Sequence, residues 1–68
     1  MEKVKMTLGA ARKNVGLTQS NAAKALGVST STLQNWEKGT TYPNQPEIDK
    51  ICNLYKIPYG CISFNPVI

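Results

Sequence analysis

A run of hydroxyl and amide side chains, "GVSTSTLQNWEKG" at residues 27–39, is the part of the sequence best suited to recognition chemistry. Asn and Gln amides can bond two atoms of an adenine edge, and Ser and Thr hydroxyls can donate or accept. Thr, Ser and Asn are also poor helix formers, so their concentration in one short predicted helix has a cost. The run is therefore either an ordinary solvated helix face or a surface that contacts DNA bases.

Helical spacing divides this run into two faces. Glycines at both ends and a suitable N-cap, Ser29, predict a helix over residues 30–38. At about 100° per residue, Leu33 and Trp36 fall together on the buried side. The opposite face holds Thr30, Ser31, Gln34, Asn35 and Lys38. The only acid, Glu37, falls near the edge of the apolar side, so no carboxylate on the polar face would repel phosphate.

Caps, prolines and helical periodicity predict the elements that position this face. We expect helices over residues 6–14, 19–26, 30–38 and 46–56, with a short helix or turn over 58–64. No alternating pattern predicts a strand. The expected core residues are Leu8, Ala11, Ala22, Ala23, Leu26, Leu33, Trp36, Ile48, Ile51, Leu54 and Tyr55. The fold class is thus all-α, a compact bundle of four to five helices.

Two capped helices joined by a tight turn that contains a glycine form a helix-turn-helix unit, here at about residues 18–38. A chain of 68 residues with 41% hydrophobic content allows a single domain over residues 1–68 and argues against disorder. We expect residues 63–68 to be a C-terminal tail. In such a unit the second helix enters the major groove of DNA by its first turn.

Charge is distributed unevenly along the chain. The whole net charge of +4 lies in residues 1–44, where six basic residues accompany two acids, while residues 45–68 are neutral. This distribution favours a polyanionic partner. Lys3 and Lys5 could form an arm that reaches DNA, although terminal lysines more often serve only solubility.

Composition argues against several other classes of protein. The chain has no His, no nucleophile elbow and no phosphate-binding glycine loop, so we expect no enzyme, no metal site and no cofactor. The two cysteines, Cys52 and Cys61, are expected to be reduced and partly buried. No apolar run approaches the roughly 18 residues of a membrane span. A signal peptide is also missing, which predicts a cytoplasmic protein.

Four stretches of the sequence resemble the Cro/CI-type (XRE) helix-turn-helix family of phage repressors and bacterial regulators. They are "GLTQ" at 16–19, "AAKALGVSTSTLQNWEKG" at 22–39, the proline at 43 and "IDKICNLYKIPYGCISF" at 48–64. The resemblance covers about residues 6–64. It implies a lambda-repressor-like fold and a transcriptional regulator, most simply a small Cro-like repressor, in a bacterial cell or encoded by a phage.

The resemblance also implies roles for individual residues. The residues at base-reading positions are Thr30, Ser31, Gln34 and Asn35. Those at phosphate-contacting positions are Gln19, Ser29, Lys38, Thr40 and Tyr42. Arg12 and Glu37 match a structural ion pair between the first and third helices, which explains the acid at the edge of the polar face.

Three departures from the family pattern limit which family roles can be assigned to residues of this sequence. Asn21 replaces the glutamate that would complete a capping box after Thr18. Gly9 is a poor helix former within the first helix. The short side chains of Thr30 and Ser31 reach less far than amides, so bridging water or deeper docking would be needed. Gln19 could also be merely a helix-start residue.

One helix contacts only a few base pairs, so we expect a homodimer on a pseudo-palindromic operator with half-sites about 34 Å apart. From the length of 68 residues we expect no small-molecule effector. The apolar residues considered for self-association, which could instead close the core, are Tyr55, Ile57, Tyr59, Ile62, Phe64, Val67 and Ile68. Two alternative functions stay open: the DNA-binding antitoxin of a toxin–antitoxin pair, and a protein-binding module with the same fold.

Overall fold

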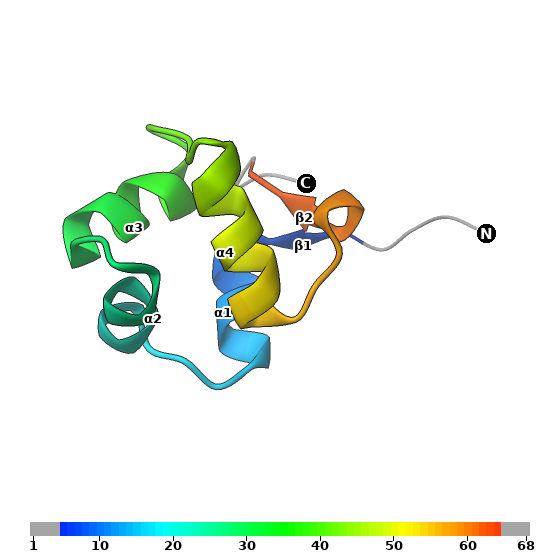
Figure 1. The fold of residues 1–68 in the computed structure, drawn as a ribbon, viewed down its shortest axis with the longest axis horizontal. Helices are drawn as coiled ribbons and strands as arrows, with labels where there is room; N and C mark the ends of the chain where they lie inside the picture. Colours follow the sequence, from blue (N-terminus) through cyan, green and yellow to red (C-terminus); the bar gives the residue numbers. More distant parts are fainter. Residues whose placement is uncertain (1–4, 65–68) are drawn as a thin grey trace.

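Four α-helices and a small parallel sheet make up residues 5–64, which are the part of the chain that the computed structural model describes. In chain order the elements are β1 (Met6–Thr7), α1 (Leu8–Asn14), α2 (Gln19–Leu26), α3 (Thr30–Lys38), α4 (Gln45–Tyr55), the 3₁₀ helix η1 (Tyr59–Cys61) and β2 (Ile62–Ser63). Helices α2 and α3 form one end of the molecule, the strands lie at the other, and α1 and α4 stand between them (Figure 1). The predicted all-α class is confirmed.

Each α-helix begins at a residue whose side chain caps it. The oxygens of Thr7, Thr18, Ser29 and Asn44 accept the backbone N–H three residues ahead, at 2.9–3.2 Å. At α4 the cap is reciprocal, because Glu47 Oε1 also accepts the Asn44 N–H at 2.9 Å. In α2 only the Thr18 side chain caps the helix, as we expected from Asn21 in place of a glutamate. These bonds satisfy N–H groups that a helix leaves without an internal partner.

Left-handed glycines end the two helices of the helix-turn-helix unit. Gly27 has φ 75° and Gly39 has φ 80°, a region in which glycine has no Cβ penalty. The following residues turn back onto the helices: the Val28 N–H donates to Ala23 O, and the Thr40 N–H donates to Asn35 O, both at 3.0 Å. The turn at Gly27 is therefore tight, and α3 starts three residues later, at Thr30.

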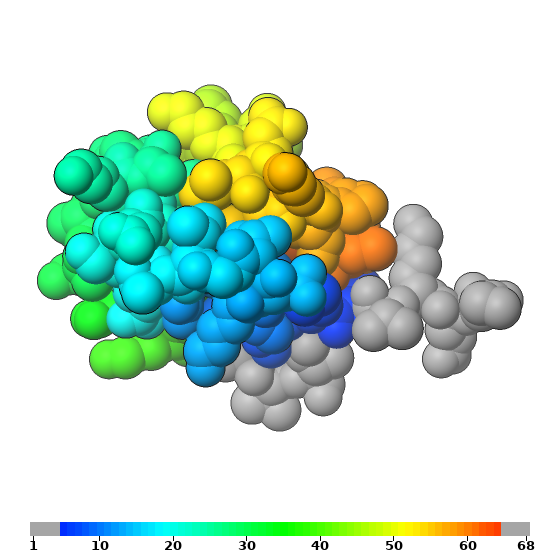
Figure 2. Space-filling model, turned by 90° about the horizontal axis from the view of Figure 1, so that it is seen from below, coloured from blue at the N-terminus to red at the C-terminus, as the bar shows by residue number. Residues whose placement is uncertain are grey.

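The core is one cluster of buried side chains drawn from all four α-helices and β2. Its members are Leu8, Ala11, Ala22, Ala23, Leu26, Leu33, Trp36, Ile51, Tyr55 and Ile62. Ala22 and Ala23 of α2 are almost wholly buried, and their small side chains allow the other helices to approach α2 closely. In the view from below, α1, α2 and α4 close against one another, and no pocket occurs among the described residues (Figure 2).

Several predicted boundaries were wrong. The first helix begins at Leu8 rather than residue 6, because Met6 and Thr7 pair in parallel with Ile62 and Ser63. The prediction that the chain contains no strand was wrong for the same reason. Helix α4 covers 45–55 rather than 46–56, since Asn44 caps it and residue 56 is already left-handed. The short helix or turn expected over 58–64 is present as the 3₁₀ helix η1, and β2 follows it.

The structure divides the apolar residues considered for self-association. Tyr55 and Ile62 are only 1% and 6% exposed and belong to the core, so they cannot form a dimer surface. The side chain of Tyr59 is 60% exposed, whereas those of Ile57 and Phe64 are half-buried against the core. The remaining two, residues 67 and 68, lie outside the described residues.

Both cysteine thiols are free and half-buried, as expected. Burial, with the nearby Asp49 carboxylate as a second cause, raises the pKa of the Cys52 thiol. Among residues 5–64, no helix is long and apolar enough to span a bilayer.

A buried hydroxyl makes Tyr55 the least satisfied polar residue of the core. Its oxygen is enclosed and has no hydrogen-bond partner within the described part of the chain. Burial, followed by the nearby Glu37 carboxylate, raises the pKa of Tyr55 from 10.0 to about 12, against a smaller opposing effect of Arg12. The phenol stays protonated in the folded protein at a pH where an unfolded chain would already ionise it.

Tyr55→Phe should therefore leave the free energy of unfolding at pH 7 unchanged or higher, because the lost hydroxyl has no partner. Between pH 10 and 12 the wild type should lose stability, since the unfolded state releases the tyrosine proton first. The variant should lack that part of the decline. Urea denaturation followed by Trp36 fluorescence measures both, with the exposed Tyr59→Phe as the matched control. A clear loss of stability at pH 7 would contradict this assignment.

Candidate nucleic-acid interface

The outward face of α3 carries all four predicted base-reading residues. Thr30 and Ser31 are exposed in its first turn, and Gln34 and Asn35 are half-buried one turn further along. Leu33 and Trp36 point the other way into the core. The predicted division of the helix into an apolar and a polar side is therefore present in the structure.

The residues predicted to contact phosphate flank this face. Ser29 is exposed at the start of α3, and Lys38 and Thr40 are exposed at its end. In the loop that follows, Tyr42 has 66% of its side chain exposed. Gln19 opens α2 and is half-buried against α3. Together these side chains lie at both ends of α3 and at the adjoining start of α2.

Ser29 has a structural role as well as an exposed position. Its Oγ accepts the backbone N–H of Thr32 at 3.1 Å and lies 2.9 Å from the Thr32 hydroxyl. If Thr32 donates to Ser29, the Ser29 hydroxyl proton stays free for an outside acceptor. The first turn of α3 contains no acid, so the positive end of the helix dipole faces outward without an opposing charge.

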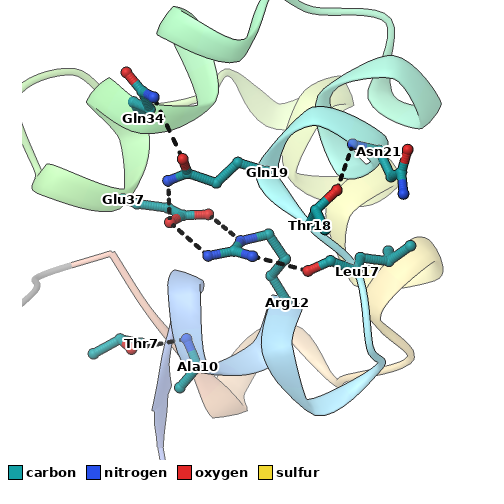
Figure 3. A network of polar contacts seen from close by, with 9 residues as sticks. All are labelled: Thr7, Ala10, Arg12, Leu17, Thr18, Gln19, Asn21, Gln34 and Glu37. Atoms are coloured by element: carbon teal, nitrogen blue, oxygen red, sulfur yellow. Dashed lines mark hydrogen bonds and ion pairs between the residues drawn. The ribbon is translucent and has the colours of Figure 1, made fainter.

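An ion pair removes the one carboxylate of α3 from the polar face. Arg12 Nε donates to Glu37 Oε2 at 2.8 Å, and Nη2 donates to Oε1 at 3.4 Å (Figure 3). Arg12 Nη1 also donates to the carbonyl of Leu17 at 2.8 Å. The two charged side chains are only 9% and 12% exposed. The structure thus brings together the pair that the family resemblance implies, and it joins α1 to α3.

Gln19 connects this ion pair to the outward face. Its Nε2 donates to Glu37 Oε1 at 3.0 Å, and its Oε1 accepts from Gln34 Nε2 at 3.4 Å (Figure 3). The family resemblance implies that Gln19 buttresses the recognition helix, and these two contacts agree with that role. The partners of Gln19 could not be identified from the sequence, because nothing local indicates that α2 and α3 exchange side-chain amides. Each amide nitrogen has two N–H groups, so Gln19 keeps one beyond the bond to Glu37.

A glycine in α1 makes room for the carboxylate. A Cβ at Gly9 would lie 3.2 Å from Glu37 Oε1, closer than side chains normally tolerate. The residue that appeared only to weaken the first helix therefore allows Glu37 to approach it. The signal was present in the sequence, since a glycine within a predicted helix often marks a close approach, but its partner could not be identified.

The helix-turn-helix family model matches residues 8–60, which is most of the chain and includes all four α-helices. The chain belongs to the XRE-type helix-turn-helix family. Comparisons with curated proteins and with solved structures found no match. Family membership makes this a DNA-binding domain of the transcription-regulator type rather than a member of an enzyme family.

Arg12→Met should destabilise the domain by about 3 kcal/mol, because it leaves the enclosed Glu37 carboxylate without its cation. Adding Glu37→Leu should recover most of this loss, since both charges are then removed and the volume is retained. Urea denaturation followed by Trp36 fluorescence provides the measurement. Asp49→Asn, which changes an exposed acid on α4, should shift stability by less than about 0.5 kcal/mol. A similarly small effect of Arg12→Met would show that the pair contributes little.

Proposed function

We propose that this protein is a sequence-specific transcriptional regulator that inserts α3 into the major groove of operator DNA, most simply a Cro-like repressor. One observation carries the proposal. The outward face of α3 presents hydroxyls, amides and one lysine, while its single carboxylate is paired with Arg12 and Gln19. A merely solvated helix has no need to remove its acid from the surface in this way.

Base contacts follow from the chemistry of this face. Asn35 and Gln34 carry amides that can bond an adenine through two atoms, and they lie one turn into the helix. Thr30 and Ser31 lie at the end of α3 that enters the groove first. Because these two side chains are short, we expect them to contact bases through water or through thymine methyl groups.

Phosphate contacts would fix the register of α3 on the duplex. Ser29 and Thr40 are exposed at the two ends of α3, and Lys38 supplies positive charge in its last turn. Gln19 has an N–H beyond its bond to Glu37, and the exposed Tyr42 hydroxyl can donate. Such contacts orient a protein on DNA without distinguishing sequences.

Affinity requires a second copy of the chain. A single module of this kind buries about 600–1,000 Å² of protein surface, which limits both affinity and the length of the site. We therefore propose a homodimer on a pseudo-palindromic operator, with half-sites about 34 Å apart along one face of the duplex. Of the residues considered for self-association, Ile57, Tyr59 and Phe64 keep some exposed surface.

Selection from a random duplex pool should enrich a pseudo-palindromic motif bound by two chains. Asn35→Ala should relax the selection at one position in each half-site and weaken binding by about 5- to 100-fold, because it removes an amide contact to a base edge. Asn53→Ala, which truncates an exposed asparagine of α4, is the matched control and should leave the motif and affinity unchanged.

The salt dependence of the same binding reaction distinguishes the alternatives. Neutralised phosphates release counterions, so affinity should fall steeply as salt rises. A motif enriched by a single chain per duplex would contradict the dimer. If no motif is enriched even at low salt, the DNA proposal fails and the protein-binding module is favoured. A small protein that copurifies with a DNA-binding chain would indicate the antitoxin.

A further inference from the structure

The contacts between Glu37, Gln19 and Gln34 have a fixed direction. A carboxylate only accepts hydrogen bonds, whereas an amide presents a donating nitrogen at one end and an accepting oxygen at the other. Gln19 must therefore turn its Nε2 toward Glu37 Oε1, 3.0 Å away. Its oxygen then faces Gln34, which must supply its own Nε2 at 3.4 Å. The orientation of both amides thus follows from the charge of one residue.

From this geometry we propose that Glu37 is a positioning residue for recognition, and that Gln34 determines specificity by presenting its carbonyl oxygen outward. Figure 3 shows that oxygen directed away from Gln19. The base that this outward oxygen contacts would then carry an exocyclic amino group, as adenine and cytosine do in the major groove. Guanine and thymine offer only acceptors there. The inference rests on the proposed function, since it names the base chemistry read by the same face.

Arg12 fixes the position of the Glu37 carboxylate, from which this series of hydrogen bonds starts. The Arg12 guanidinium only donates hydrogen bonds, and its Nε lies 2.8 Å from Glu37 Oε2. A third bond, from Arg12 Nη1 to the carbonyl of Leu17, anchors the guanidinium to the α1–α2 connection. Glu37 Oε2 therefore takes the short bond from Arg12, while Oε1 accepts from Gln19 at 3.0 Å and more distantly from Arg12 Nη2 at 3.4 Å.

Glu37→Gln should reverse the orientation of the two amides that follow it in this series of hydrogen bonds, those of Gln19 and Gln34. The glutamine oxygen should occupy the Oε2 position, because an amino group there would lie 2.8 Å from the Arg12 Nε donor, whereas at the Oε1 position it lies 3.4 Å from Arg12 Nη2. Its amino group then lies at the Oε1 position and donates to the oxygen of Gln19. The Gln19 amide turns over, its nitrogen faces Gln34, and Gln34 offers its oxygen inward and its amino group to the DNA. The preferred base edge should change from donor to acceptor.

Functional-group deletion in the operator selected above tests this inference. Single adenines are replaced by purine, which lacks the amino group, and single cytosines by pyrimidin-2-one. Guanines are replaced by 2-aminopurine, which lacks O6. For wild type, one amino deletion per half-site should weaken binding by about 5- to 10-fold, the loss expected for one base contact. In Gln34→Ala the same deletion should have no effect, which assigns the contact to Gln34.

Glu37→Gln should become insensitive to that amino deletion, and its own selection should favour an acceptor edge at the same position. Asp49→Asn removes one negative charge, as Glu37→Gln does, but from an exposed position on α4. It should keep the wild-type sensitivity to the amino deletion. Circular dichroism at the binding temperature establishes that all variants are folded. A merely structural role for Glu37 would lower the affinity for every operator alike, without exchanging one base preference for another.

Three outcomes would overturn the inference. The first is a wild-type contact at Gln34 that depends on O6 of guanine rather than on an amino group. The second is equal sensitivity to amino deletion in wild type and Gln34→Ala. The third is an unchanged preference in folded Glu37→Gln. Failure of the wild type to select any motif would instead remove the proposed function itself, so the two failures are distinguishable.

Discussion

The ion pair between Arg12 and Glu37 is the interaction on which the arrangement of the other elements depends. It joins α1 to α3 across the interior, and its guanidinium also holds the connection to α2 through the Leu17 carbonyl. Enclosing one of these charges without the other would be costly, so changing either residue alone should lower the free energy of unfolding. Gly9 supports the same interaction, because its lack of a side chain leaves space for the Glu37 carboxylate beside α1.

This interaction also explains how one short helix serves two purposes. Leu33 and Trp36 anchor α3 in the core, while its acid is turned toward α1 rather than toward the surface. The face that remains is rich in residues that form helices poorly. Compensation comes from the ends, where Ser29 caps the first turn and Gly39 closes the last. The helix is thus stabilised by its core contacts and its caps rather than by the helix propensity of its outer residues.

Local signals in the sequence predicted the helix-turn-helix unit well. The boundaries of α2 and α3 follow from Thr18, Ser29 and two glycines, each of which acts within a few residues of its own position. The pairing of Met6 with Ile62 could not be predicted, since two-residue strands carry no periodic pattern and their partners are far apart in the chain. The left-handed Lys56 was missed because lysine gives no signal for that conformation.

The candidate site was predictable only in part, because spacing within one helix is visible in the sequence and packing between helices is not. Helical spacing alone grouped Thr30, Ser31 and Asn35, and the family resemblance added the ion pair. The bond between Gln19 and Gln34 depends on how closely α2 and α3 pack, which spacing within either helix does not define. Tertiary packing therefore decides the orientation of the amides, although sequence decides which amides are available.

The most direct measurement of the central claim is a titration of isotopically labelled protein with the selected duplex, followed through the side-chain amide resonances. If α3 enters the major groove, the amides of Gln34 and Asn35 should shift strongly while those of Gln45 and Asn53, on α4, stay in place. Shifts confined to α4, or none on α3, would contradict the account and show that the polar face of α3 does not contact DNA.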